Sequence, residues 1–459
     1  MKVPIAYSKR TKKPIGISYE EYGMPYTEFV DERGEIKSIF EGEPKRKTPL
    51  PLTVNVKFLH ETKLLRNPHI LPFLPFFQDL PKSYVYRKPK PIENIEIERL
   101  IIGGGTSGIA TLDSKSLLIT RELFGDIIFD ISPSPFLEKN EIIKRLKEKV
   151  KENEQRVLYG NYIGKFDEGI LVELRDKFLL VNAKKVVVST GARTLKPIFN
   201  GNWEPGIVSR EFYLKKLGPE KNGKILVLGF NDLAAKTALN ANNAIILAPK
   251  HIEFSFSPYF RELIEEKGIE IKRDYITEVK STNQKIVVNT ESNTYEVSLV
   301  VFSTLKQPRI EVTSSMGIPY TYEGHLYKPI KTNSGVDFTG GTLGIVDEYL
   351  SFLSGEALNN PDKLEEFKKL HYTEAQNNSL SESPYYYGSK GVVCECEEVY
   401  LEDIEYAKSL GMRDTEEVKR VTGLGTGKCQ GKACVITSAD YMKSPVLISF
   451  RTPIYPVRL

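Results

Sequence analysis

Residues 95–112 read IEIERLIIGGGTSGIATL, and this stretch decides the fold class. An apolar run suited to a strand leads into glycines spaced as Gly103-x-Gly105-x-x-Gly108, and a second apolar run, SLLIT, follows at 116–120. In this dinucleotide-binding fingerprint the first glycine allows a tight turn, the second lets a pyrophosphate approach the backbone, and the third lets helix and strand pack closely. The sequence therefore predicts an α/β, Rossmann-like fold. Its phosphate-binding residues are expected to be Gly103, Gly104, Gly105, Thr106, Ser107 and Gly108.

Just after the fingerprint the sequence departs from the usual pattern at two points. The carboxylate that binds ribose, expected about 20 residues further on, is replaced by Thr120, with Arg121 beyond it. The interval from Gly108 to Thr120 is also about two helical turns shorter than a standard crossover helix. We therefore expect an intact phosphate cradle and an altered adenosine end beside Thr120 and Arg121. FAD, NAD or another adenine nucleotide remains open, as does a nucleotide fold without a ligand.

Two later segments resemble parts of flavoproteins with two dinucleotide-binding domains. Residues 183–207, AKKVVVSTGARTLKPIFNGNWEPGI, resemble the strand whose backbone passes beside the flavin nucleotide in that fold. Residues 335–358, GVDFTGGTLGIVDEYLSFLSGEAL, keep the glycine turn of the last strand but lack the acid that normally binds the ribityl chain. The resemblance implies FAD-binding residues at Thr190, Gly191, Ala192, Arg193, Gly340, Gly341 and Thr342.

A second strand, turn, helix and strand unit lies at 222–250, with the spacing Gly229-x-Asn231-x-x-Ala234. Asn231 stands where a glycine normally admits a pyrophosphate, so a working NAD site is not expected. The sequence thus predicts a dinucleotide-binding domain in two pieces, with a degenerate second domain inserted between them and an extended interface region before both. The predicted limits are 1–95 for the interface region, 96–221 and 306–372 for the first domain, and 222–305 for the inserted domain.

All four cysteines of the chain lie near its C-terminus, at Cys394, Cys396, Cys429 and Cys434. A Cys-x-Cys pair on an extended segment puts both sulfurs on one face. The second pair comes from a loop with Gly423, Gly425 and Gly427, and Cys434 is expected to open a helix. Four thiolates so placed favour an iron–sulfur cluster. Zinc, which usually takes wider spacings, and a disulfide remain the alternatives.

The cysteine region also carries a family resemblance. Residues 392–434 resemble the bacterioferritin-associated-ferredoxin type of [2Fe–2S] domain, and the CQGKAC motif is similar to that of A-type (alpha) subunits of heteromeric amine-oxidising flavoenzymes. That family includes sarcosine oxidase alpha, opine oxidases, hydrogen cyanide synthase and dye-linked L-proline dehydrogenases. The resemblance implies a small helical [2Fe–2S] domain at 391–445, after a linker at 373–390 and before an extended tail at 446–459.

The same resemblance implies cofactors and partners. It implies a [2Fe–2S] cluster and FAD, with FMN at a subunit interface as a further option. The partners would be a flavin-containing catalytic subunit of amino-acid-oxidase fold, in which the amine or amino acid is oxidised, and an electron acceptor. The chain would then be an oxidoreductase subunit that carries electrons. A self-sufficient NAD(P)H-dependent reductase and a non-enzymatic cluster-binding scaffold are the alternatives.

Composition excludes some other classes. The formal net charge of +4 over 459 residues is too small to indicate nucleic-acid binding. No apolar run reaches the roughly 18 residues of a membrane-spanning helix, so a cytoplasmic protein is expected. Abundant Lys and Glu with few Cys are typical of thermophilic proteins. The five histidines are scattered, and no acid–base or nucleophile pattern is evident, which favours an electron conduit over a substrate-oxidising site. These histidines are His60, His69, His251, His325 and His371.

Overall fold

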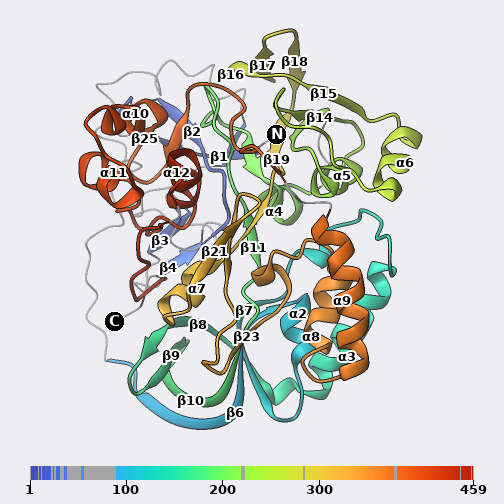
Figure 1. The fold of residues 1–459 in the computed structure, drawn as a ribbon, viewed down its shortest axis with the longest axis vertical. Coiled ribbons are helices and arrows are strands. Elements are labelled where there is room, and N and C mark those ends of the chain that lie inside the picture. The colour runs from blue at the N-terminus through green and yellow to red at the C-terminus, as the bar shows by residue number, and fades with distance from the viewer. Residues whose placement is uncertain are drawn as a thin grey trace.

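The computed structural model places two stacked α/β units and a smaller helical unit beside them (Figure 1). Several parts of the chain, the longest at 56–88, fall outside the residues that it describes. The described residues are 2–8, 10–11, 13–21, 24, 27–30, 36–38, 53–55, 89–218, 223–282, 285–376, 380–444, 446–455 and 457.

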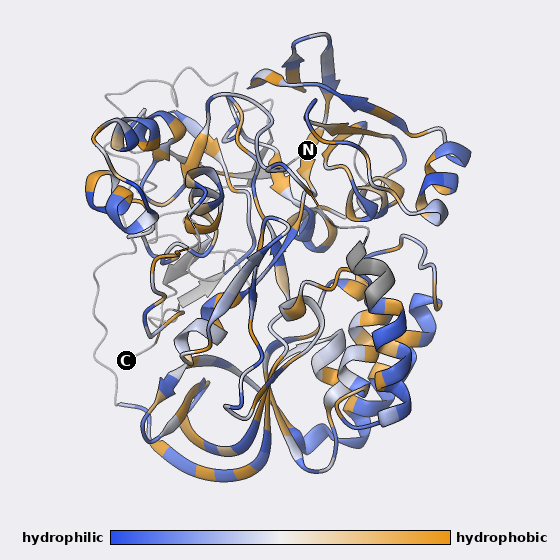
Figure 2. Ribbon diagram, viewed as in Figure 1, coloured by the Kyte–Doolittle hydropathy of each residue, from blue (hydrophilic) through white to orange (hydrophobic). Residues whose placement is uncertain are grey.

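The first unit is a mostly parallel sheet in the order β23-β10-β6-β7-β8-β9. Strand β9 pairs antiparallel with both β8 and β10, so part of the sheet closes on itself, and the curved strands alternate polar and apolar residues (Figure 2). Leu100 and Ile102 face one core, while Ile101 between them faces another, as the two-residue period of a strand requires. The strands are β6 (Ile92–Gly105), β7 (Ser116–Phe124), β8 (Val157–Phe166), β9 (Gly169–Leu174), β10 (Phe178–Val188) and β23 (Val336–Phe338).

Helices cover one side of this sheet. The first of them, α2, has only six residues, which agrees with the short interval expected after the fingerprint. The others contact α2 or one another and bury Ile142, Leu146 and Phe352. The helices are α2 (Thr106–Thr111), α3 (Lys139–Glu152), α8 (Glu348–Glu356) and α9 (Pro361–Gln376). Short turns of other helix types lie at η4 (Gly125–Ile128), η5 (Glu154–Arg156) and η8 (Gly340–Leu343).

The second unit is a parallel sheet in the order β12-β19-β13-β14-β15. Every residue of β13, β14 and β19 is buried, as expected of parallel strands covered on both faces. Strand β12 precedes the predicted 222–305 interval, yet it forms the edge of this sheet. The parallel strands are β12 (Ile207–Ser209), β13 (Ile225–Leu228), β14 (Ala244–Ala248), β15 (Glu270–Arg273) and β19 (Leu299–Phe302), and the helical segments are α4 (Arg210–Phe212), η6 (Tyr213–Leu217), α5 (Asp232–Leu239) and α6 (Pro258–Glu266). An antiparallel sheet adds β16 (Ile276–Ser281), β17 (Ile286–Thr290) and β18 (Thr294–Val297).

The two α/β units are joined by adjacent crossings of the chain. The chain leaves the first unit through β11 (Ala192–Thr194) and returns through β20 (Lys306–Pro308), and these strands pair antiparallel. After β20 come α7 (Ile310–Ser315), β21 (Tyr320–Glu323) and β22 (Leu326–Pro329). This paired crossing lies between the two nucleotide folds, where the cavity described below is found.

The C-terminal unit contains the cysteines, and strands near the N-terminus lie beside it (Figure 1). Its elements are β24 (Val392–Cys394), β25 (Val399–Tyr400), α10 (Leu401–Ser409), α11 (Thr415–Thr422) and α12 (Cys434–Met442). The N-terminal strands are β1 (Lys2–Tyr7), β2 (Pro14–Gly16), β3 (Glu28–Val30), β4 (Ile36–Ser38) and β5 (Thr53–Asn55). Among the helices that the structure describes, none has the length and apolarity needed to cross a membrane.

Candidate functional site: a nucleotide cavity beside a four-cysteine pocket

The glycines of the first fingerprint have three different surroundings. A Cβ on Gly103, whose φ is +110°, would lie 2.3 Å from the carbonyl oxygen of Ser189. A Cβ on Gly108 would lie 1.9 Å from the carbonyl oxygen of Gly103, so both positions require glycine for close packing. A Cβ on Gly105 would meet no atom within 4 Å. Gly105 therefore borders open space, where a ligand can approach the backbone.

That open space is a cavity of about 240 Å³ between the two α/β units. Gly191 also borders it, and a Cβ there would likewise meet nothing within 4 Å. The cavity brings together most of the residues expected to bind a nucleotide: Gly103, Gly104, Gly105, Thr106, Ser107, Thr120, Arg121, Thr190, Gly191, Ala192 and Gly341. Four expected residues lie outside its lining: Gly108, Arg193, Gly340 and Thr342.

Several buried polar atoms of the cavity wall have no hydrogen-bond partner among the described residues. They are Thr190 Oγ1, Arg309 Nη1 and Glu20 Oε2. The first two can donate a hydrogen bond, and a buried donor without a partner is costly. An acceptor-rich ligand such as a nucleotide would satisfy them. The cavity therefore fits a nucleotide by its backbone cradle and by its free donors.

Thr120, at the position where a ribose-binding carboxylate is usual, bonds to the backbone of the turn. Its Oγ1 accepts a hydrogen bond from the N–H of Gly104 at 2.9 Å and donates one to the carbonyl of Glu122 at 2.5 Å. Thr120 thus fixes the turn instead of offering a carboxylate to ribose. Beside it, the Arg121 guanidinium lies over the ring of Tyr455, 4.6 Å from its centroid. The C-terminal tail therefore supplies part of the cavity wall, which no motif indicated.

Arg193 does not have the role that the flavoprotein resemblance implied. Its side chain is 1% exposed and forms ion pairs with Glu21 at 3.0 Å and Glu311 at 2.5 Å. It also donates to the carbonyl of Lys432, in the loop between the second pair of cysteines. Burial alone would raise the pKa of Glu21, but Arg193 and Arg309 lower it to about 2. Arg193 therefore joins the N-terminal segment, α7 and the cysteine loop, and does not face the nucleotide.

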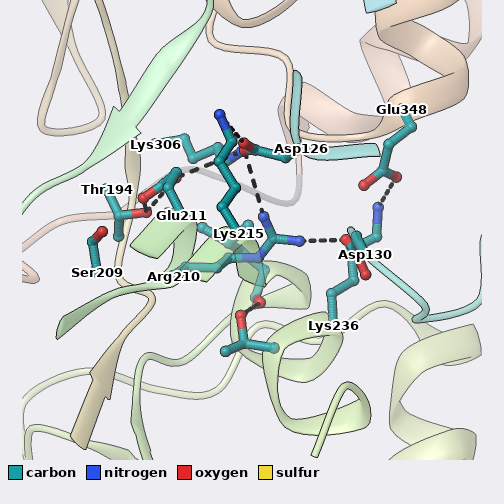
Figure 3. Close-up of polar contacts among 12 residues, drawn as sticks. Asp126, Asp130, Thr194, Ser209, Arg210, Glu211, Lys215, Lys236, Lys306 and Glu348 are labelled. Atoms are coloured by element: carbon teal, nitrogen blue, oxygen red, sulfur yellow. Dashed lines mark hydrogen bonds and ion pairs between the residues drawn. The ribbon is translucent and has the colours of Figure 1, made fainter. Parts of the chain in front are cut away.

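Charged residues from both α/β units form a network along one edge of the cavity (Figure 3). Asp126, which follows β7, pairs with Lys306 of β20 at 2.9 Å. Asp130 pairs with Lys139 at 2.9 Å and with Arg210 of α4. Burial would raise the pKa of both aspartates, but these neighbouring cations hold each pKa well below its usual value. The network therefore fastens one unit to the other with ionised groups.

The second glycine turn is filled by its own side chains. A Cβ on Gly229 would lie 2.4 Å from the carbonyl oxygen of Ser303, so the turn is tightly packed. The Asn231 side chain accepts from the N–H of Leu233 at 3.2 Å and donates to the carbonyl of Thr304 at 3.1 Å. Asn231 is also 5% exposed. The amide therefore occupies the space that a pyrophosphate would need, which agrees with the expectation of a degenerate site.

The four cysteines lie around one small pocket of about 20 Å³. Cys394 ends β24, Cys396 lies in the following turn, and Cys434 begins α12 as expected. All four are free thiols, so no disulfide is formed. The Sγ atoms of Cys396 and Cys429 are 3.2 Å apart, and Cys394 interacts with Cys434. The four cysteines thus line the same pocket.

The glycines of the cysteine loop have different roles. A Cβ on Gly427 would lie 2.2 Å from that of Cys396, so this glycine admits the ligand itself. Gly423 instead ends α11 in the left-handed region, with φ +78°. Gly425 has φ +75°, and a Cβ there would meet Val435 at 2.9 Å. Gly427 thus gives room to Cys396, while the other two glycines shape the loop.

The pKa values of the thiols shift in opposite directions. A hydrogen bond with a neighbouring thiol, together with burial, raises the pKa of Cys396 and that of Cys434 well above the usual value, whereas the pKa of Cys429 is lowered. A hydrogen bond from Cys396 is the main cause that lowers the pKa of Cys429 to about 7, and Lys432 and backbone N–H groups also lower it. A lowered pKa favours the thiolate, which is the form that binds iron. Within the described ranges, no three or more His, Cys, Asp or Glu side chains form a compact site for a single metal ion.

The cavity and the cysteine pocket share a wall. Tyr19, from the N-terminal segment, lines both. Its hydroxyl accepts a hydrogen bond from the N–H of Lys196 at 2.8 Å, and its ring packs edge-on against Phe302, 5.5 Å between centroids. Sequence reasoning missed Tyr19 because the N-terminal region shows no periodic pattern.

The histidines that the structure describes line neither site. His251 Nε2 contacts the carbonyl of Ser383 at 2.8 Å, and His325 Nδ1 lies 2.6 Å from Asp440. His371 is in α9, whereas His60 and His69 fall outside the described residues. The described histidines are therefore placed as structural groups.

Comparisons with known proteins identify the C-terminal domain and the fold of the whole chain. Residues 392–444 match the family described as BFD-like [2Fe-2S] binding domain. A search of curated proteins found no match. The crystal structure of L-proline dehydrogenase from P. horikoshii is similar over 100% of this chain and 97% of that one, with a TM-score of 0.64 and 20% identity. Thioredoxin reductase of T. acidophilum is similar over 60% of this chain and 99% of that one, with a TM-score of 0.43 and 14% identity.

At these identities the structural likeness is one of fold. The chain combines a flavoprotein-like dinucleotide-binding fold with a C-terminal [2Fe–2S] domain. The domain match supports the [2Fe–2S] cluster expected from the sequence, and the cavity beside Gly105 agrees with the expected FAD.

Proposed function

We propose that the chain is the electron-transfer subunit of a heteromeric flavin-dependent amine or amino-acid dehydrogenase or oxidase. Its cluster would exchange electrons with a flavin, and a separate flavin-containing subunit of amino-acid-oxidase fold would oxidise the substrate. The full-length likeness to an L-proline dehydrogenase and the A-type sequence motif support donors with a CH–NH bond, such as proline, sarcosine or opines.

The observation that carries the proposal is the shared wall at Tyr19. A residue that lines both the nucleotide cavity and the four-cysteine pocket leaves no other layer of protein between the two sites at that point. Electron tunnelling becomes faster as the intervening distance decreases, so the protein's task is to hold the two groups close. A chain that only stored a cluster would have no need for this arrangement.

The residues of this chain would bind, orient and shield the two groups. A flavin nucleotide, when bound, supplies two-electron chemistry, and the cluster supplies one-electron chemistry. Gly105 and Gly191 leave room for the pyrophosphate of the nucleotide, while Thr190 and Arg309 offer it hydrogen-bond donors. Cys394, Cys396, Cys429 and Cys434 would ligate the irons. Tyr19, which is 4% exposed, excludes water from the wall between them.

The test is purification of the native complex, followed by assays of the complex and of the isolated chain. We expect co-purification of a second flavin-bearing chain, dye reduction by the complex with one amine of a panel, and none by the isolated chain. Turnover by the isolated chain at the rate of the complex would overturn the conduit role. Bleaching of its spectrum by NAD(P)H would instead support a self-sufficient reductase.

A variant pair tests the shared wall itself. Tyr19→Ala should slow reduction of the cluster after flavin reduction, because it removes the ring between the sites, whereas Tyr19→Phe should preserve the rate. Cluster and flavin content, measured by absorbance, should remain at wild-type levels in both. Equal transfer rates in Tyr19→Ala and wild type would contradict the route through this wall.

A further inference from the structure

The pocket of the four cysteines is lined by one buried cation, Lys196, that does not belong to the matched [2Fe–2S] domain. Lys196 follows β11, the strand by which the chain leaves the first α/β unit. Its side chain is 7% exposed. The first unit therefore places a buried ammonium group beside ligands that are about 200 residues away along the chain.

Three contacts fix this lysine in place. Its Nζ forms an ion pair with Glu395, whose side chain is 12% exposed. The same Nζ lies 5.9 Å from the ring centroid of Trp203, and the backbone N–H donates to Tyr19 at 2.8 Å. The two side-chain contacts hold the ammonium group at the pocket, and the backbone contact fixes the chain at this residue.

The partner, Glu395, is the residue between Cys394 and Cys396. Its negative charge is added to that of four thiolates in a site with little water. Buried charges in such surroundings interact strongly, and removal of one partner leaves the other uncompensated. Lys196 cancels the charge of Glu395, so a change to either member alters the net charge beside the cluster ligands and with it the ease with which the cluster accepts an electron.

We propose that Lys196 and Glu395 form a charge pair that sets the reduction potential of the cluster. Reduction adds one electron and hence one negative charge to the cluster, and it requires no proton from this pair. A nearby cation stabilises the reduced form, and a nearby anion destabilises it. Lys196 is a positioning residue in this scheme, since it need not touch the irons. The inference rests on the proposed function only in that it requires the cluster.

Three variants test the sign of each charge. Lys196→Met should shift the midpoint potential to a more negative value, because Glu395 is then uncompensated. Glu395→Gln should shift it to a more positive value, because Lys196 then acts alone. The double variant should return toward the wild-type value, as a charge effect predicts and general damage does not. The readout is the EPR signal of the reduced cluster in a redox titration of the full-length protein.

A matched control is the buried ion pair of Lys90 with Glu173, 2.6 Å apart in the first sheet, whose side chains are 15% and 4% exposed. Lys90→Met should leave the midpoint unchanged. If Lys196→Met loses the cluster, Glu395→Gln still decides the question. An unchanged midpoint in Glu395→Gln, with an intact cluster, would overturn the inference. Failure of the wild-type chain to bind any [2Fe–2S] cluster would instead overturn the proposed function.

Discussion

The two glycine turns of the molecule have the same local fold and opposite surroundings. At the first, Gly105 borders a cavity, and a Cβ there would meet nothing within 4 Å. At the second, a Cβ on Gly229 would collide with the carbonyl oxygen of Ser303, and the Asn231 amide occupies the space of a bound pyrophosphate. A strand, a glycine turn and a helix are therefore enough for the fold, whereas binding depends on what the rest of the chain leaves open. The predictions below test this difference, from the largest expected effect to the smallest.

The largest loss of stability is expected from breaking the buried charge network that joins the two α/β units. Arg210→Met removes the cation from Asp130, whose carboxylate is buried. Breaking a buried ion pair costs about 3–5 kcal/mol. Because Lys139 still faces Asp130, the free energy of unfolding in a denaturant titration should fall by an amount toward the lower end of that range. Arg145→Met, which breaks an exposed pair with Glu141, should cost less than about 1 kcal/mol. Equal losses in the two variants would show that the network does not fasten the units.

Low pH should destabilise the fold through Glu21, which lines the cavity at the first turn. The pKa of this cavity residue is about 2, below its ordinary value of 4.5, so its ionised form stabilises the fold. That contribution is complete above about pH 4.5 and is lost as the pH falls through about 2, with a size of about 3 kcal/mol. Unfolding titrations between these pH values should show a shallower dependence in Glu21→Gln than in wild type. Identical slopes would assign the acid sensitivity to other groups.

The packed turn should not tolerate added volume. In Gly229→Val the new Cβ must displace the Ser303 carbonyl or the Ala234 side chain, at 2.4 and 2.6 Å. Overpacking of this kind costs about 1–3 kcal/mol, measurable as a lower melting temperature. The nucleotide released on denaturation should remain at the wild-type amount per chain. A lowered amount would mean that the second turn takes part in binding.

A valine at the open turn should leave the stability of the fold nearly unchanged but should weaken nucleotide binding. Gly105→Val places its side chain in the cavity, so the free energy of unfolding without ligand should change by less than about 0.5 kcal/mol. Retained nucleotide should fall about tenfold, which corresponds to about 1.4 kcal/mol of binding free energy. Cluster absorbance should stay constant. Wild-type nucleotide content in this variant would show that the first turn is only structural.

Sequence patterns predicted the parts of the site that depend on neighbours along the chain. The fold class, the short first helix, the filled second turn and the convergence of four cysteines each follow from spacing over a few tens of residues. Arg193 was assigned wrongly because its position after Gly191 suggested a flavin contact, while its partners Glu21 and Glu311 lie 172 and 118 residues away. Tyr19 and Tyr455 carry no motif at all. Their roles arise only when the two ends of the chain meet the body.

The contact between Ser8 and Glu398 has a consequence for how the protein is made. The Ser8 hydroxyl donates to Glu398 at 2.7 Å, and the Arg10 backbone N–H donates to the same carboxylate oxygen, across a separation of nearly the whole chain. A ribosome releases the N-terminal segment long before residue 398 exists, so this contact can form only late in synthesis. Contacts of such long range close slowly. Completion of the cysteine region thus coincides with the docking of Ser8 and Arg10 onto Glu398.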